Sequence, residues 1–186
     1  YSGAATKTVA AGGTLSVAGN FSTTGGTATF ATTANATITG NITGNGAITM
    51  GSGTITIGGN WTNNGTFTAG TSTVTYNTTG GGQTVRGATY NNLTLNNTSG
   101  IDTAGDAITV GATFTTSANG TLDMVTNALS VTTVSHAGIL KTQNTSSTPL
   151  TTGKTWGGTV QYNGSAQTVI PGTYNNLTLS GSDAKT

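Results

Sequence analysis

Apolar and polar residues alternate along most of this chain. In the segment Thr54-Ile55-Thr56-Ile57, threonine takes every other position and isoleucine the positions between. Successive side chains of a β-strand point to opposite faces, so the pattern predicts a short strand with threonine towards water and isoleucine in a core. The same alternation occurs at residues 14–17, 27–30, 37–39, 66–68, 73–76, 93–95 and 108–110. The sequence therefore predicts an all-β protein of short, half-buried strands.

The segments between these strands carry turn residues. Asn-Gly dipeptides occur at 45–46, 64–65, 119–120 and 163–164. Both residue types tolerate the positive φ that tight turns need. We therefore expect the chain to change direction after each strand of three to five residues.

One segment of the chain is duplicated. Residues 90–95 and 174–179 both read Tyr-Asn-Asn-Leu-Thr-Leu, and each copy follows Gln-Thr-Val at the same distance, 84 positions apart. The last residues, 179–186, resemble residues 1–8. Internal repetition is typical of arrays and solenoids rather than of catalytic domains.

The duplication suggests a division of the chain. We assign residues 1–94 to a first β-repeat unit and residues 95–178 to a second. Residues 179–186 then begin a further repeat or form a terminal assembly strand.

Two all-β architectures can hold such strands. In an elongated parallel β-solenoid, also called a β-helix, each short strand pairs with the strand one turn earlier, and low charge leaves flat turns free to stack. In tandem antiparallel β-sandwiches, each repeat unit would be one domain of about 100 residues. We prefer the solenoid, because its turns need only short strands flanked by Gly and Asn corners.

The composition excludes several classes of binding partner and site. Only 5% of the residues are charged and the net charge is +1, so the chain has no basic patch for nucleic acid. No apolar run is long enough to cross a membrane as a helix. Without cysteine, the fold has neither disulfides nor thiolate metal sites. Disorder is the simplest interpretation of a Gly-, Thr- and Asn-rich chain, but linkers do not need the alternation described above.

Residues 57–68, together with 73–77, 83–85 and 90–95, resemble the β-strand repeats of very large secreted bacterial surface adhesins, which are similar to haemagglutinin-type β-helices. The resemblance covers nearly the whole chain. It implies an extracellular structural or adhesive role. The second unit departs from the pattern at Ser135-His136 and at Thr148-Pro149-Leu150, where Gly and Asn corners are expected.

No group of residues points to catalysis. His136 is the only histidine, and we interpret it as a surface or corner residue rather than a base. Asp102 and Asp106 are four positions apart without the pattern of a calcium loop, and we interpret them as solvated loop acids. We therefore expect no enzyme activity, no catalytic residue, no cofactor and no metal.

Two binding surfaces are alternatives. The aromatic residues could form a platform that stacks on sugars, although their inward phase in the strands favours core packing. The outward threonines could align on a flat face, as in some ice-binding solenoids, although β-propensity alone also selects threonine there. A carbohydrate- or ice-binding solenoid module is therefore a third hypothesis.

We expect this protein to be a secreted, non-enzymatic structural subunit of an extracellular filament or cell-surface array. Copies would join head-to-tail through β-strand edges, because an uncapped solenoid end is a template for pairing. The expected partner is another copy, with contacts to the cell surface or to glycans as a further possibility, and a stalk segment of a large adhesin is the alternative. The tentative assembly interface comprises Tyr1, Lys7, Val9, Tyr174, Leu177, Leu179 and Lys185.

Overall fold

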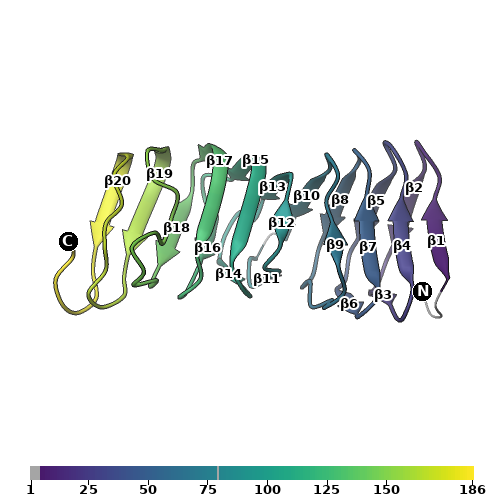
Figure 1. Ribbon diagram of the computed structural model, residues 1–186, viewed down its shortest axis with the longest axis horizontal. Helices are drawn as coiled ribbons and strands as arrows, with labels where there is room; N and C mark the ends of the chain where they lie inside the picture. Colours follow the sequence, from purple (N-terminus) through teal and green to yellow (C-terminus); the bar gives the residue numbers. More distant parts are fainter. Residues whose placement is uncertain (1–4, 79) are drawn as a thin grey trace.

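The computed structural model describes residues 5–78 and 80–186, and Figure 1 shows them as a row of strands stacked along one long axis. None of the described residues lies in a helix. The strands form parallel sheets that make a β-solenoid of about nine turns. The predicted solenoid is confirmed. The alternative of antiparallel sandwiches is wrong, because every strand pairing among the described residues is parallel.

The strands and bridges of the solenoid form three faces, and the chain visits these faces in the same order in every turn. The first face consists of β1 (Thr6–Val9), β4 (Thr27–Phe30), β7 (Ala47–Met50) and β9 (Phe67–Thr68), followed by β12 (Thr89–Tyr90). It continues through the first residues of β15 (Ile108–Thr116) and of β17 (Leu129–His136).

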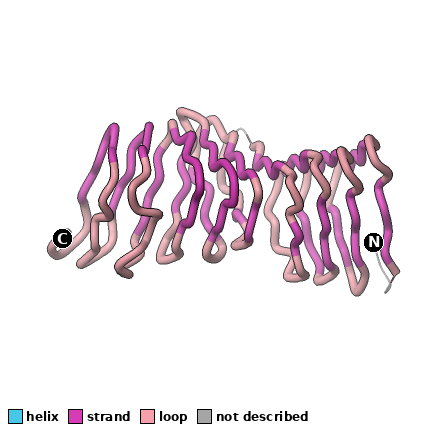
Figure 2. The backbone as a smooth tube through the Cα atoms, turned by 45° about the horizontal axis from the view of Figure 1, so that its top comes forward, coloured by secondary structure: helices cyan, strands magenta, loops and turns pink. Residues whose placement is uncertain are grey.

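The second face is a continuous parallel sheet. It consists of β2 (Thr14–Val17), β5 (Asn35–Ile38), β8 (Thr54–Ile57), β10 (Thr73–Tyr76) and β13 (Asn92–Leu95), and then the last residues of β15 and β17. Figure 2 shows these strands as a regular rank in the N-terminal half.

The third face begins with β3 (Phe21–Thr23) and β6 (Ile42–Gly44), followed by Trp61, which bridges to Ile42. It continues with β11 (Thr84–Val85), β14 (Ile101–Ala104), β16 (Thr121–Asp123), β18 (Ile139–Thr142), β19 (Thr155–Tyr162) and β20 (Thr173–Leu179). The strands β19 and β20 are long enough to run from the second face around the corner onto the third.

The length of a turn varies. Lys7 pairs with Ala28, 21 positions later, whereas Val160 pairs with Leu177, 17 positions later. The corners absorb this difference, because they hold few side chains in the core. The structural repeat is therefore one turn of about 20 residues. The duplicated segments, 84 positions apart, are separated by slightly more than four turns.

The interior is a single apolar column. Away from the two end turns, inward residues of all three faces are buried, and the largest of them are Trp61, Trp156, Tyr76, Tyr90, Tyr162, Phe30 and Phe114. Outward positions alternate with them, as the pattern iBiB of β8 and β10 shows. The predicted alternation is confirmed strand by strand, and core packing of these aromatic side chains replaces the sugar-stacking platform.

The corners are held by polar groups from successive turns. Asn41 donates its backbone N–H to Asn20 Oδ1 at 2.8 Å, and Asn60 does the same to Asn41 Oδ1 at 2.7 Å. Gly44 sits at another corner with φ near 100°, where a Cβ would lie 1.8 Å from the carbonyl O of Thr23. Backbone groups that leave the strand ladder thus find partners one turn away.

Candidate functional site

The C-terminal turn presents apolar side chains to solvent. Leu177 and Leu179 of β20 have 41% and 51% of their surface exposed, although both point along the inward direction of the third face. Their counterparts in the first copy of the hexapeptide, Leu93 and Leu95, are 0% and 1% exposed. The difference is the strand that follows, because β15 covers β13 and no described strand covers β20.

The residues after β20 begin another turn. Thr186 donates its backbone N–H to the carbonyl O of Gln167 at 3.1 Å and accepts a bond from the N–H of Val169 at 2.7 Å. This is the pairing of a parallel ladder, and it places Lys185 beside Gln167 at an inward position. The Lys185 ammonium donates to the carbonyl oxygens of Gly164 and Ser182 at the corner.

The N-terminal turn has a different character. Lys7 of β1 is paired with Ala28, so it stands at an inward position of the first face although it is exposed. Val9 is paired with Phe30 and is half-buried. Inward charge at an edge strand discourages indiscriminate pairing. Of the seven residues predicted for an assembly interface, Tyr1 lies outside the described residues, and the other six lie in the first turn or at the C-terminal end.

The duplicated segments build the same buried hydrogen-bond network. In the first copy, Tyr90 Oη donates to the carbonyl O of Arg86 at 2.7 Å, and the Arg86 N–H donates to Tyr76 Oη at 3.0 Å. The two hydroxyls are 3.4 Å apart. Gln83 Nε2 donates to the carbonyl oxygens of Ile57 and Gly59, one turn earlier. We call this network the first clasp.

The second clasp repeats these contacts with new residues. Tyr174 Oη donates to the carbonyl O of Ile170 at 2.7 Å, and the hydroxyls of Tyr162 and Tyr174 are 3.2 Å apart. Gln167 Nε2 donates to the carbonyl oxygens of Thr142 and Asn144. Burial raises the pKa of Tyr76 to about 12 and the pKa values of Tyr90, Tyr162 and Tyr174 above their usual range. All four phenols are neutral hydrogen-bonding groups at ordinary pH.

The two clasps lie on different faces. Tyr76 belongs to β10, which pairs with β8 and β13 in the sheet of the second face. Its counterpart Tyr162 belongs to the part of β19 that pairs with β18 in the sheet of the third face. The 84-residue spacing is thus four turns plus one further face, and the second copy is rotated by one face about the solenoid axis.

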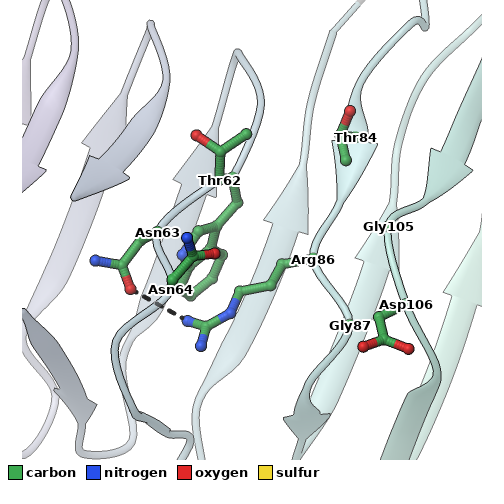
Figure 3. Close-up of a pocket in the computed structure, with 9 residues that line it drawn as sticks. Thr62, Asn63, Asn64, Thr84, Arg86, Gly87, Gly105 and Asp106 are labelled. Carbon is green, nitrogen blue, oxygen red and sulfur yellow. Dashed lines mark hydrogen bonds between the residues drawn. The ribbon is translucent and has the colours of Figure 1, made fainter. Parts of the chain in front are cut away.

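A shallow groove lies beside the first clasp, where the chain passes from the third face to the first. Its volume is about 470 Å³, and Figure 3 shows its lining. The lining residues are Trp61, Thr62, Asn63, Asn64, Thr84, Arg86, Gly87, Gly105 and Asp106. The polar side chains of this lining can form hydrogen bonds with a ligand. The Trp61 ring offers no stacking surface, because it is buried in the core.

Arg86 is already engaged inside this groove. Its guanidinium carbon lies 5.4 Å from the centre of the Trp61 ring, and its Nη atoms donate to Asn63 Oδ1 and to the carbonyl O of Gly65. The side chain extends towards Asn63 and away from Asp106 (Figure 3). Partial burial lowers the pKa of Arg86, mainly by desolvation. Arg86 therefore stabilises this corner of the solenoid and does not present a free cation to a ligand.

Two titratable residues lie where the sequence did not place them. His136, predicted as a surface or corner residue, is 4% exposed, and its ring packs edge-to-face with Trp156 at a centroid distance of 5.9 Å. Burial lowers the pKa of His136 to about 4. Asp102, predicted as a solvated loop acid, is buried in β14, where Oδ1 accepts the N–H of Gln83 at 3.0 Å. Desolvation raises the pKa of Asp102. Both predictions were wrong, because each residue takes an inward position in a strand.

The described residues contain no group of three or more His, Cys, Asp or Glu that could hold a metal ion. Within the same residues, no helix is long and apolar enough to cross a membrane. No family, no curated protein and no solved structure matches this chain. The structure shows the β-solenoid fold that the resemblance implies, and membership of the adhesin family stays a prediction.

Sequence reasoning located the hexapeptides but missed what they do. The glutamines of the two Gln-Thr-Val segments donate hydrogen bonds to carbonyl oxygens of the preceding turn. In each clasp the second tyrosine donates a hydrogen bond to a backbone carbonyl O at the next corner. A signal was available, since Tyr90 and Tyr174 each follow the clasp glutamine by the same number of positions. The spacing in the sequence did not reveal that the second copy is rotated by one face. That rotation depends on the lengths of the turns, which vary.

Proposed function

We propose that this protein is a non-enzymatic structural element, a β-solenoid rod that stacks end to end in an extracellular filament or surface array. The observation that carries the proposal is the apolar C-terminal end, where Leu177 and Leu179 stand exposed at positions that are buried in the interior turns. Exposed inward residues and an open strand edge favour addition of another turn.

The register of the two ends supports head-to-tail stacking. Lys185 and Thr186 pair beside Gln167 and Thr168 with the phase that Lys7 and Thr8 show in β1, the lysine inward and the threonine outward. A second copy placed in this register would put β1 in the place of Lys185 and Thr186, which would leave the end of the solenoid, and β3 over β20. Leu177 and Leu179 would then lie beneath Phe21 and Thr23, which are inward residues of the third face. Each face of one copy continues in the next, which gives an open filament.

A second candidate is a stalk segment of a large surface protein. The pairing of Thr186 with Gln167 and Val169 favours it, because this pairing starts a further turn. In a stalk, the covering turns come from the same polypeptide and hold a binding region away from the cell. Both candidates use the same physical feature, a solenoid end that continues.

The test is electron microscopy of the purified chain with its mass distribution measured over a range of concentrations. We expect filaments whose length grows with concentration. A variant with Leu177→Glu and Leu179→Glu should stay monomeric, while a control with Thr43→Glu and Thr103→Glu, outward positions of the same face, should still assemble. Monomers of the wild-type chain at every concentration would contradict head-to-tail assembly and favour the stalk.

A further inference from the structure

The second face carries a long, uninterrupted column of hydroxyl groups. Strand pairing aligns one outward residue from each of seven successive turns: Ser16, Thr37, Thr56, Thr75, Thr94, Thr115 and Ser135. All seven side chains are exposed or half-exposed. None of the seven hydroxyls takes part in a hydrogen bond with another described residue.

A second column runs parallel to the first, two residues earlier in each strand. It consists of Thr14, Asn35, Thr54, Thr73, Asn92, Thr113 and Thr133. The two asparagines fix the register, because Asn35 Oδ1 accepts the N–H of Thr54 at 2.7 Å and Asn92 Oδ1 accepts the N–H of Thr113 at 3.2 Å. The face is therefore a two-dimensional grid, with steps of about 4.8 Å between strands and about 6.6 Å along each strand.

The grid is electrically neutral. None of the Lys, Arg or Asp residues of the chain lies in the strand segments that form it, and His136 at its C-terminal edge points into the core. The third face differs. One of its outward columns includes Asp123, Lys141 and Gln161, and the two charged groups form an ion pair at 3.6 Å. The grid ends at β17, where Lys154 of the next turn donates to the carbonyl O of Thr132 at 2.7 Å.

We propose that the second face binds a crystalline, uncharged surface, and specifically the surface of ice. A charged polymer finds no counter-charge on this face. A flexible molecule gains little from a grid that repeats over seven turns. A solid whose hydrogen-bonding groups repeat in two dimensions can meet many hydroxyls at once. Each contact is weak, but the contacts add on a rigid scaffold whose ordering cost is already met by the strand ladder.

Threonine suits this ligand chemically. Its hydroxyl donates and accepts hydrogen bonds, while its methyl group is apolar, and both belong to a side chain with restricted χ1. Ranks of such side chains can hold ordered water in a fixed pattern that merges with a growing ice layer. The proposal is independent of end-to-end stacking, because the grid runs along the side of the rod and stays open in a filament.

The test uses the whole chain and measures thermal hysteresis and the fraction of protein that partitions into a slowly growing ice crystal. We expect activity in the wild-type chain and its loss in a variant with Thr56→Lys and Thr75→Lys, which interrupts the middle of the grid. A matched variant with Thr43→Lys and Thr103→Lys, outward on the third face, should keep the activity. Circular dichroism and thermal unfolding check that both variants keep the fold.

Three results would overturn the proposal. One is a wild-type chain that neither shapes ice nor enters it. Another is equal loss of activity in the two variants, which would separate ice binding from the second face. The third is binding of the wild-type chain to crystalline cellulose or chitin, blocked by Thr56→Lys and Thr75→Lys, with no effect on ice, which would assign the grid to a polysaccharide.

Discussion

The hexapeptide Tyr-Asn-Asn-Leu-Thr-Leu occurs once in the interior of the solenoid and once at its C-terminal end. Each copy closes a clasp of two tyrosines and a glutamine, so the local fold is the same. The burial is not. Leu93 is fully buried in the interior, and Leu177 is 41% exposed at the end. Local sequence therefore sets which way a side chain points, while the next turn decides whether that side chain is buried.

The largest expected effect comes from truncating the two leucines. Leu93→Ala should lower the free energy of unfolding by about 2–5 kcal/mol, because it opens a cavity in a packed core. Leu177→Ala should cost about 1 kcal/mol or less in the monomer, since its side chain is half in water. Urea unfolding at low protein concentration measures both. Equal costs in the two variants would mean that the end is covered.

The buried histidine makes the stability of the fold depend on pH. His136 in the fold has a pKa of about 4, against 6.5 for an exposed histidine. As the pH falls from about 6.5 to 4, the unfolded chain takes up a proton that the fold excludes, so stability is lost over this range, by about 3 kcal/mol. Urea midpoints at pH 7 and pH 4.5 measure the loss. His136→Phe should remove most of this pH dependence, and a variant with the wild-type slope would contradict the assignment.

The glutamines of the two clasps should matter about equally. Gln83→Ala removes two hydrogen bonds to carbonyl oxygens. Gln167→Ala removes two such bonds and a third, which its Oε1 accepts from the Gly164 N–H, and we expect a cost of about 1–3 kcal/mol in each variant. Gln161→Ala, which removes an outward glutamine, should change stability by about 0.5 kcal/mol or less. Thermal unfolding of the three variants gives the comparison. A much smaller effect of Gln167→Ala would show that the second clasp is loosened by its position near the end.

The smallest effect concerns the residue beside each clasp glutamine, Asp102 in the interior and Lys185 at the end. Asp102→Asn should stabilise the fold by about 1 kcal/mol at pH 7, because asparagine still accepts the Gln83 N–H without a buried charge. Since burial raises the pKa of Asp102, the wild-type chain loses stability as the carboxyl ionises with rising pH, and the gain should fade near pH 3. Lys185→Met should have little effect. A destabilised Asp102→Asn variant at pH 7 would contradict this account.

Most of the fold followed from the alternation of residues. The strands expected at residues 14–17, 27–30, 54–57 and 73–76 are β2, β4, β8 and β10 with the same bounds. The length of a turn did not follow, because corners of unequal size hide a period of about 20 residues behind the stronger 84-residue duplication. The division into units 1–94 and 95–178 stays a prediction.

The site residues show the same limit. Leu177 and Leu179 were predicted for an assembly interface from the repeat alone, and the sequence could not give their exposure, because exposure depends on a strand from outside the segment. His136 and Asp102 were misplaced because polar residues in a Thr-rich segment suggest solvent. In the structure, the phase of β17 and β14 turns them inward. Assembly, secretion and adhesion remain proposals.

A disulfide trap tests end-to-end stacking most directly. The chain has no cysteine, and stacking in the proposed register brings Ser22 of one copy beside Thr178 of the next, both outward on the third face. A chain with Ser22→Cys and Thr178→Cys should form a ladder of disulfide-linked oligomers under mild oxidation. A control with Thr43→Cys and Thr178→Cys should stay monomeric, because its cysteines would lie one strand further apart, beyond the reach of a disulfide. Monomers in both cases, or equal ladders, would contradict the account.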